Sequence, residues 1–117
     1  MKKTVSLKKN YEFVRIYKKG RFYAGRFIVL YVLKNNYGVN RLGIAISRKV
    51  GKSVRRNRIR RLVRESYRVY EEFIKDGLDM VFSARSTEKT PDYSEISKEM
   101  KFLLKKLEVL DMDKWNA

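Results

Sequence analysis

Residues 48–68 read RKVGKSVRRNRIRRLVRESYR, and the composition of this stretch is unlike that of the rest of the chain. Ten of its 21 residues are Lys or Arg, eight of these are Arg, and Glu65 is its one acid. Elsewhere Lys outnumbers Arg by 14 to 5. The planar guanidinium of Arg pairs bidentately with phosphate and stacks on bases. The local change from Lys to Arg therefore indicates a surface that binds a phosphate-containing partner.

The same stretch has the periodicity of an amphipathic helix that begins near Ser53. Its apolar side, which we expect to be buried, consists of Ile59, Leu62, Val63, Ser66, Tyr70 and Phe73. The opposite side gathers Arg60, Arg61, Arg64 and Arg68, and the first turns hold Arg55, Arg56, Asn57 and Arg58. Val50-Gly51 is predicted to form a turn that orients the helix start, whose free N–H groups favour anions.

The basic face has two interpretations, an ordinary solvated helix face or a face that a polyanion completes. Like charges at neighbouring helical positions, such as Arg56–Arg60 and Arg60–Arg64, each destabilise an isolated helix by roughly 0.2–0.5 kcal/mol. A solvated face normally intersperses acids, and this one has almost none, so we favour the polyanion. Asn57 either contacts a base edge or sugar or is simply a polar residue of an early turn.

The charge of the chain is unevenly distributed. Of the formal net charge of +16, residues 1–70 carry +19 and residues 71–117 carry −3. With 117 residues and 44% hydrophobic composition, the chain is predicted to form one domain, residues 1–117, around a single modest core. One portion of its surface should be strongly positive, which is typical of nucleic-acid-binding domains.

Residue types that are missing exclude several functions. The chain has no Cys and no His, which removes disulfides, Cys/His zinc sites and catalysis by either side chain. The N-terminus has no apolar signal region and no run approaches membrane-spanning length, so we expect a soluble, cytoplasmic protein. A membrane-surface role for the basic helix is disfavoured because its apolar side is needed for the core.

β-Branched and aromatic residues predict strands at residues 26–34 and 41–49, paired in antiparallel register through a turn at residues 35–38. Alternation places Leu42, Ile44 and Ile46 on one face with Ile28, Leu30 and Val32. It places Gly43, Ala45 and Ser47 on the other face with Phe27, Val29 and Tyr31. A third strand at residues 79–85 has Val81, Ser83 and Arg85 on one face, and its register is left open.

Helices are predicted before and after these strands. A helical pattern over residues 6–19 has Asn10 as a candidate N-cap and ends at Gly20. The last helix begins at Thr90-Pro91 or Ser94, with Ile96, Met100, Leu103, Leu104 and Leu107 directed at the sheet. Phe13 and Tyr17 are four residues apart and share a face, and the alternative to a binding role is that both belong to the core. The aromatic and small residues of the second sheet face suit either single-stranded nucleic acid or a covering helix.

The segment SRKVGKSVRRNRIRRLVRESYR resembles the signature of the protein subunit of bacterial ribonuclease P around its Arg-Asn-Arg motif, here Arg56-Asn57-Arg58. The opening LKKNYEFVRIYKKG, Leu30-Tyr31 and Arg41-Leu42-Gly43 extend the resemblance in order and spacing, with a weaker match at Ala84-Arg85. The resemblance implies an α+β fold, a single-domain α–β sandwich with helices packed on a small, mainly antiparallel sheet. It also implies an unusual left-handed crossover between the basic helix and the sheet, against the usual rule.

The function that the resemblance implies is that of an RNA-binding subunit. It would assist a catalytic RNA in the endonucleolytic removal of the 5′ leader from precursor tRNA. The implied partners are the catalytic RNA subunit and the precursor leader, with no small-molecule substrate. Mg²⁺ is expected at the active site of the RNA, and neither a catalytic side chain nor a metal site is assigned to this chain.

The resemblance also implies two groups of site residues. The group expected to bind the RNA subunit is Lys52, Arg55, Arg56, Asn57, Arg58, Arg60, Arg61, Arg64 and Arg68. The group expected to form a cleft for the precursor leader is Phe13, Tyr17, Tyr31, Ala45, Ser47, Lys49 and Arg85, with Arg56, Asn57 and Arg60 at its edge. Tyr17 stands where the family often has Phe, and Ser86-Thr87 replaces a common Lys-Pro.

Two other functions are weighed against this one. A stand-alone metal-dependent nuclease would need the acids Glu71, Glu72, Asp76 and Asp79, which look better suited to a helix end and a turn. The other alternative is a general RNA-binding protein or chaperone of ribosomal-protein type. A cleavage assay distinguishes these three functions. In it, precursor tRNA is incubated with the protein alone, with the RNA subunit alone and with both together.

Overall fold

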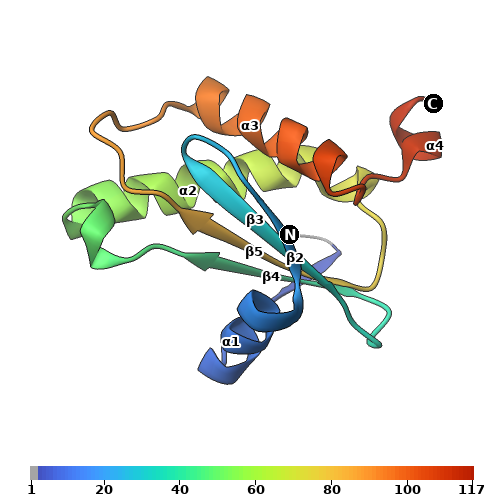
Figure 1. The fold of residues 1–117 in the computed structure, drawn as a ribbon. Coiled ribbons are helices and arrows are strands. Elements are labelled where there is room, and N and C mark those ends of the chain that lie inside the picture. Colours follow the sequence, from blue (N-terminus) through green and yellow to red (C-terminus); the bar gives the residue numbers. More distant parts are fainter. Residues whose placement is uncertain (1–2) are drawn as a thin grey trace.

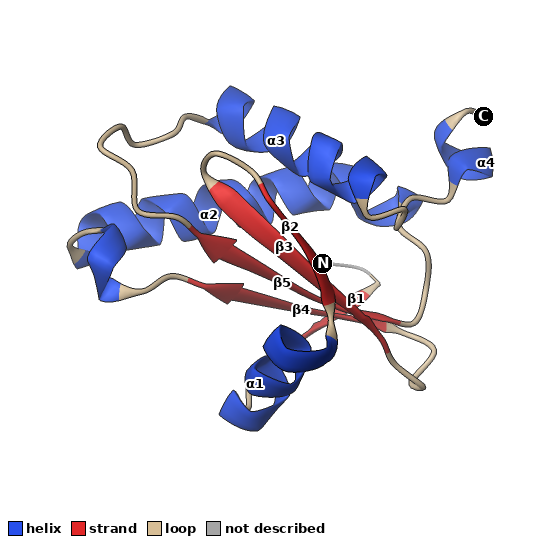
Figure 2. Cartoon of the chain, viewed as in Figure 1, coloured by secondary structure: helices blue, strands red, loops and turns tan. Residues whose placement is uncertain are grey.

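The computed structural model describes residues 3–117, which form a five-stranded sheet with helices on both of its faces (Figures 1 and 2). The strands are β1 (Thr4–Ser6), β2 (Arg21–Ala24), β3 (Ile28–Lys34), β4 (Asn40–Ala45) and β5 (Leu78–Ala84). The helices are α1 (Asn10–Lys19), α2 (Ser53–Tyr70), α3 (Tyr93–Lys106) and α4 (Met112–Trp115), with 3₁₀ turns η1 (Arg48–Val50) and η2 (Glu71–Phe73). Figure 1 shows α2 and α3 on one face of the sheet and α1 on the other.

The order of the strands in the sheet is β1-β4-β5-β3-β2. β3 pairs antiparallel with β2 and β5, whereas β4 pairs parallel with β1 and β5. The predicted hairpin between residues 26–34 and 41–49 is therefore wrong, because β5 lies between these two strands. Residues 78–82 of β5 are all buried, and a strand that is buried on both faces is most stable at the centre of a sheet.

The α+β prediction is confirmed, with the difference that the sheet is mixed, with as many parallel as antiparallel pairings. α2 joins β4 to its parallel neighbour β5. This is the connection for which the resemblance implies a left-handed crossover, and its hand stays a prediction. Within residues 3–117, no helix is both long enough and apolar enough to cross a membrane.

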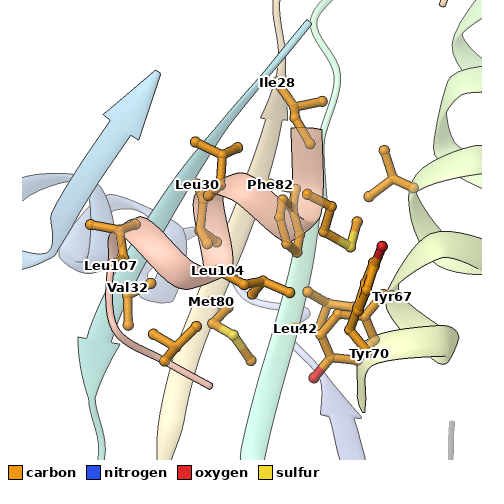
Figure 3. Packing of buried hydrophobic residues seen from close by; sticks show 14 of the residues in the cluster. Ile28, Leu30, Val32, Leu42, Tyr67, Tyr70, Met80, Phe82, Leu104 and Leu107 are labelled. Carbon is orange, nitrogen blue, oxygen red and sulfur yellow. The ribbon is translucent and has the colours of Figure 1, made fainter. Parts of the chain in front are cut away.

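The main core lies between the sheet and the helices α2 and α3 (Figure 3). Ile28, Leu30 and Val32 of β3 face α3, as the predicted alternation requires, and Met100, Leu103 and Leu104 of α3 are fully buried. On α2 the predicted stripe is buried at Ile59, Val63, Ser66 and Tyr70 and partly buried at Leu62. Tyr67 is also fully buried, against Phe82. Periodicity missed Tyr67 because it lies at the border between the two faces of the helix.

Two helix starts differ from the prediction. Lys9, not Asn10, is the N-cap residue of α1, and no side chain caps this end. At α3 neither Thr90-Pro91 nor Ser94 is the cap. Asp92 accepts the backbone N–H of Glu95, and Glu95 accepts that of Asp92, which is a reciprocal capping box.

Candidate nucleic-acid interface

Most of the basic side chains of α2 are solvent-exposed. Arg58, Arg61, Arg64 and Arg68 are exposed, as are Lys52 and Asn57. Among the residues that the structure describes, no arginine of α2 takes part in a salt bridge. The acidic C-terminal part of the chain thus leaves these guanidinium groups free, and the solvated-face interpretation lacks the interspersed acids that it requires.

The first turn of α2 combines exposed charge with partly buried charge. Gly51 follows η1 and precedes the helix with φ of 151°, a conformation that favours glycine. Arg55 donates to the carbonyl of Thr87 at 2.5 Å, so part of its guanidinium is used within the protein. The Nε atoms of Arg55 and Arg56 are both buried without a hydrogen-bond partner among residues 3–117. A buried donor of this kind costs free energy unless a partner supplies an acceptor.

The second face of the sheet is assembled by the register of its three inner strands. Tyr31 of β3 and Gly43 of β4 both pair with Val81 of β5, and Ala45 pairs with Ser83. These side chains therefore lie on one face, which settles the register that the sequence leaves open. We call this face, with the aromatic side chains of α1 that border it, the groove.

Helix α1 covers only the centre of the groove. Ile16 of α1 is buried there with Leu7 and Val81 as a second, small core. Phe13, Tyr31 and Ala45 pack against this core and stay partly exposed. The predicted covering helix is thus present at the centre of the face, whereas the aromatic side chains at its borders stay partly exposed, and their binding of single-stranded nucleic acid stays a prediction.

Two tyrosines form the aromatic wall of the groove. The rings of Tyr17 and Tyr31 meet edge to face, with centroids 4.8 Å apart. Tyr17 keeps 38% of its surface exposed. Partial burial, and then the neighbouring Tyr31, raise the pKa of Tyr17, so the phenol is neutral at physiological pH. A neutral ring with one open side can stack on a base without repelling the adjoining phosphates.

Three residues of the predicted cleft lie beyond the ends of strands. β4 ends at Ala45, so Ser47 is an exposed residue of the following loop and Lys49 belongs to η1. The hydroxyl of Ser86 donates to the carbonyl of Lys49 at 3.0 Å, which brings Lys49 close to Arg85. Arg85 itself donates to the carbonyl of Gly25 at 2.7 Å. These cationic residues lie at the end of the groove where α2 begins.

One predicted member of this face belongs elsewhere. Phe27 is buried in the main core, on the opposite side of the sheet from Tyr31. β3 begins only at Ile28, so strand alternation does not extend to Phe27. The backbone there bends instead, because the carboxylate of Glu99 accepts three successive N–H groups, those of residues 26, 27 and 28, at 2.7, 2.8 and 2.7 Å.

A buried charge network fixes α1 over the sheet, and sequence reasoning missed it. Arg41 of β4 donates through Nε and Nη2 to both carboxylate oxygens of Asp79, at 2.8 and 2.7 Å, and through Nη1 to Glu12 of α1. Asn35 donates a further hydrogen bond to Asp79 at 2.8 Å. Burial raises the pKa of Asp79, but the hydrogen bonds from Arg41 and Asn35 outweigh burial and hold it below its usual value.

The basic helix and the groove meet at one place. Arg60 and Arg64 of α2 line a pocket together with Phe13 of α1 and Gly43 of β4. The free edge of β4 beyond β1 lies here, since β1 pairs only with residues 40–42. Arginine and aromatic side chains are therefore adjacent here, although they come from widely separated parts of the sequence.

Comparison with known proteins shows the family of this chain. The family model for ribonuclease P matches residues 1–108. The chain belongs to the ribonuclease P protein family. It is 48% identical over 101 residues to the ribonuclease P protein component of Clostridium botulinum (strain Langeland), which covers 86% of this chain and 91% of the relative. It is 43% identical over 108 residues to that of Clostridioides difficile, covering 92% and 95%.

Solved structures of ribonuclease P proteins share the fold. The Staphylococcus aureus protein superposes with a TM-score of 0.79 at 37% identity, over 90% of this chain and 96% of that one. The Thermotoga maritima protein gives 0.77 at 33% identity, over 86% and 96%. As a ribonuclease P protein, the chain is an RNA-binding component of an endoribonuclease that acts in tRNA 5′ maturation.

The acidic residues that a stand-alone nuclease would need are dispersed or engaged. Asp79 is held by Arg41, and Glu71 is buried and accepts the backbone N–H of Lys3 at 3.0 Å. Asp76 is exposed and lies 3.9 Å from the Lys3 ammonium. Across residues 3–117, no three carboxylates come together as a candidate metal site.

Proposed function

We propose that this ribonuclease P protein binds the catalytic RNA through α2 and holds the 5′ leader of precursor tRNA in the groove. The observation that carries the proposal is the shared pocket of Arg60, Arg64 and Phe13. Folded RNA on α2 and a single strand in the groove would meet there without crossing the protein. A substrate strand could then leave the RNA active site and enter the groove directly.

The proposed RNA-subunit surface is the unpaired basic side of α2. Its members are Lys52, Arg55, Arg56, Asn57, Arg58, Arg60, Arg61, Arg64 and Arg68. Phosphates of the RNA would supply the charges that the protein lacks on this face. The Nε atoms of Arg55 and Arg56 are equally buried and unpartnered, and Arg55, which already donates through Nη2 to Thr87, would contribute only part of its guanidinium.

The proposed leader cleft combines stacking surfaces with cations. Phe13, Tyr17, Tyr31 and Ala45 form its floor and wall, and Ser47, Lys49 and Arg85 lie at its α2 end. Base–aromatic stacking tolerates every sequence, because each base has a π-face. The cleft would therefore accept leaders of differing sequence, as a tRNA-processing enzyme with many substrates requires.

Mg²⁺ is proposed to bind to the RNA subunit. Asp79 does not suit a metal, since both of its carboxylate oxygens accept from Arg41. At an RNA site the ion would activate water and stabilise the leaving oxygen. The protein's part would be to position the leader and offset repulsion between two polyanions. The cytoplasm, where precursor tRNA is made in bacteria, is the proposed place of action.

A reconstitution assay tests the proposal. Precursor tRNA is incubated with the protein, with the RNA subunit and with both, at a Mg²⁺ concentration that limits the RNA alone. We expect cleavage at the mature 5′ end to need the RNA and to be accelerated by the protein. Cleavage by the protein alone would support a nuclease, and an unchanged rate of RNA-driven cleavage would leave only general RNA binding.

A further inference from the structure

Phe22 is an exposed aromatic residue on the edge strand β2, outside the group of cleft residues assigned above. It pairs directly with Tyr31 across the antiparallel ladder between β2 and β3. The two rings are stacked, with centroids 5.5 Å apart and an angle of 29° between their planes. Phe22 nevertheless keeps 61% of its surface exposed. One side of the ring thus contacts Tyr31, and much of the remainder faces solvent.

We propose that Phe22 is an additional nucleobase-stacking site, which extends the groove to the outer edge of the sheet and binds leader nucleotides distant from the cleavage site. This inference rests on the proposed function, because it requires the leader to lie in the groove. Four aromatic rings then follow one another from β4 to β2, in the order Phe13, Tyr17, Tyr31 and Phe22.

The length of this aromatic row suits a short single strand. It crosses from β4 over β5 and β3 to β2, which is three steps between neighbouring strands. At about 4.8 Å for each step, the row spans roughly 14 Å. That distance accommodates two or three nucleotides of extended RNA, so Phe22 provides room for a base beyond those at Phe13 and Tyr31.

The charges around the row select an anionic occupant. The carboxylates on this face belong to Glu12 and Asp79, and Arg41 binds both. Lys18 and Lys19 end α1 just before β2 begins, and neither forms a salt bridge in the part of the chain that the structure describes. An apolar protein segment would leave these ammonium groups without partners, whereas an RNA strand supplies a base for the ring and phosphates for the lysines.

The direction of the leader follows from the place of the RNA subunit. If α2 binds the catalytic RNA, the scissile bond lies near the β4 edge of the groove, where Arg60 and Arg64 border Phe13. The leader then runs from that pocket toward β2. Phe13 and Tyr17 would contact nucleotides closer to the cleavage site, and Phe22 would contact nucleotides further from it.

Abasic substitution along the leader, combined with protein variants in the reconstituted holoenzyme, tests this assignment. We expect Phe22→Ala to weaken precursor binding about fivefold or more, the lower end of the effect of losing one stacked base. An abasic site at one distal leader nucleotide should weaken wild-type binding equally and have no further effect on Phe22→Ala. Phe22→Trp should bind the precursor as the wild type does. Phe22→Leu should lose most of the binding free energy that Phe22 contributes, since leucine is apolar but does not stack.

Tyr23→Ala is the matched control, because Tyr23 is the next residue of β2 and faces the other side of the sheet. Its ring contacts Phe102 of α3, with centroids 5.8 Å apart. We expect this variant to keep wild-type leader binding. If Phe22→Ala or Phe22→Leu binds every leader as the wild type does, the inference is wrong. It is equally wrong if Phe22→Ala only alters self-association of the protein in sedimentation experiments.

Tyr17→Ala in the same scan separates this inference from the proposed function. Tyr17→Ala and an abasic site nearer the cleavage site should have non-additive effects on precursor binding. If they do, but Phe22→Ala and every abasic site have additive effects, only the role of Phe22 is overturned. If the effects of both variants are additive with those of every abasic site, the leader cleft itself is overturned.

Discussion

The ring of Phe13 lies over Gly43, with no room between them for a side chain. A β-carbon on Gly43 would lie 2.6 Å from Cζ of Phe13 and 3.3 Å from Cδ1 of Leu7. Gly43 does not have a positive φ, so its backbone conformation does not require glycine. Glycine is needed here because a side chain would block the close approach of α1. The position of the first aromatic side chain of the groove therefore depends on a missing methyl group in β4.

Gly43→Ala is expected to displace Phe13 and weaken precursor binding several-fold. Overpacking of this kind costs about 1–3 kcal/mol, which urea unfolding of the protein will measure. The double variant Gly43→Ala/Phe13→Leu removes the clash and should recover stability but not binding. Wild-type stability and binding in the single variant would contradict the packing described here.

Tyr17→Ala should weaken the binding of precursor tRNA and leave that of mature tRNA unchanged. Loss of a base–aromatic stack corresponds to about 1–3 kcal/mol. Tyr11, on the same helix and 67% exposed, contacts no other aromatic ring, and Tyr11→Ala is the control. Filter binding of both RNAs to the holoenzyme measures the difference, and equal loss for precursor and mature tRNA would refute the leader cleft.

Arg64→Ala is expected to weaken binding to the RNA subunit and to flatten its dependence on salt. Each phosphate contact contributes a slope of roughly 0.7–0.9 in a plot of log K against log salt concentration, so the slope should fall by about one contact. Lys98→Ala removes an exposed cation from α3 instead. If both variants lower the slope equally, the effect is one of net charge and α2 is not the specific surface.

Acid should destabilise the protein through Asp79. Its folded-state pKa is held below the ordinary value of 3.8 by Arg41 and Asn35, against the effect of burial. A carboxyl group whose pKa is lower in the folded than in the unfolded protein stabilises the fold at pH values above its unfolded-state pKa. This contribution is lost as the pH falls through its folded-state pKa. The free energy of unfolding should therefore drop below about pH 4, and Asp79→Asn should flatten this drop.

Unfolding by urea at several pH values measures the effect of Asp79. Asp76→Asn changes an exposed carboxylate, with 64% of its side chain accessible, and should keep the wild-type slope. An equal acid dependence in the wild type and Asp79→Asn would show that the network around Arg41 does not control acid stability.

Glu99→Ala is expected to loosen the turn between β2 and β3. Three backbone N–H groups would lose a charged acceptor, and single hydrogen bonds to charged groups contribute about 1.5–3 kcal/mol. We expect a loss of at least about 2 kcal/mol in stability and faster amide exchange in residues 22–28. Glu99→Gln, which keeps one acceptor oxygen, should lose less, and unchanged exchange in Glu99→Ala would contradict this role.

The parts of the fold that depend on local sequence could be predicted. α2 begins at Ser53 as its periodicity indicates, because helical hydrogen bonds and faces are set within a few residues. The pairing of the strands could not be predicted, since the position of β5 between β3 and β4 depends on contacts between distant segments. β2 was missed because all four of its residues are exposed, so no alternation of buried and exposed residues marks it.

The candidate site shows the same division. Arginines on one helix and the pair Phe13–Tyr17 are visible as spacing within one element. The network of Glu12, Arg41 and Asp79 joins three elements, and only the register of β4 with β5 brings Arg41 and Asp79 side by side. Phe22 was overlooked for a similar reason, since its partner Tyr31 is apparent only from the ladder between β2 and β3.

The strand order has a consequence for synthesis on the ribosome. β5, the central strand, is the last strand in the sequence, so a nascent chain that ends before Leu78 contains β3 and β4 with their inner edges unpaired. Such a chain has already exposed the arginines of α2, but the floor of the groove is missing. Because N-terminal segments emerge first, translation produces the arginine side of α2 before it completes the sheet face on which the proposed leader cleft depends.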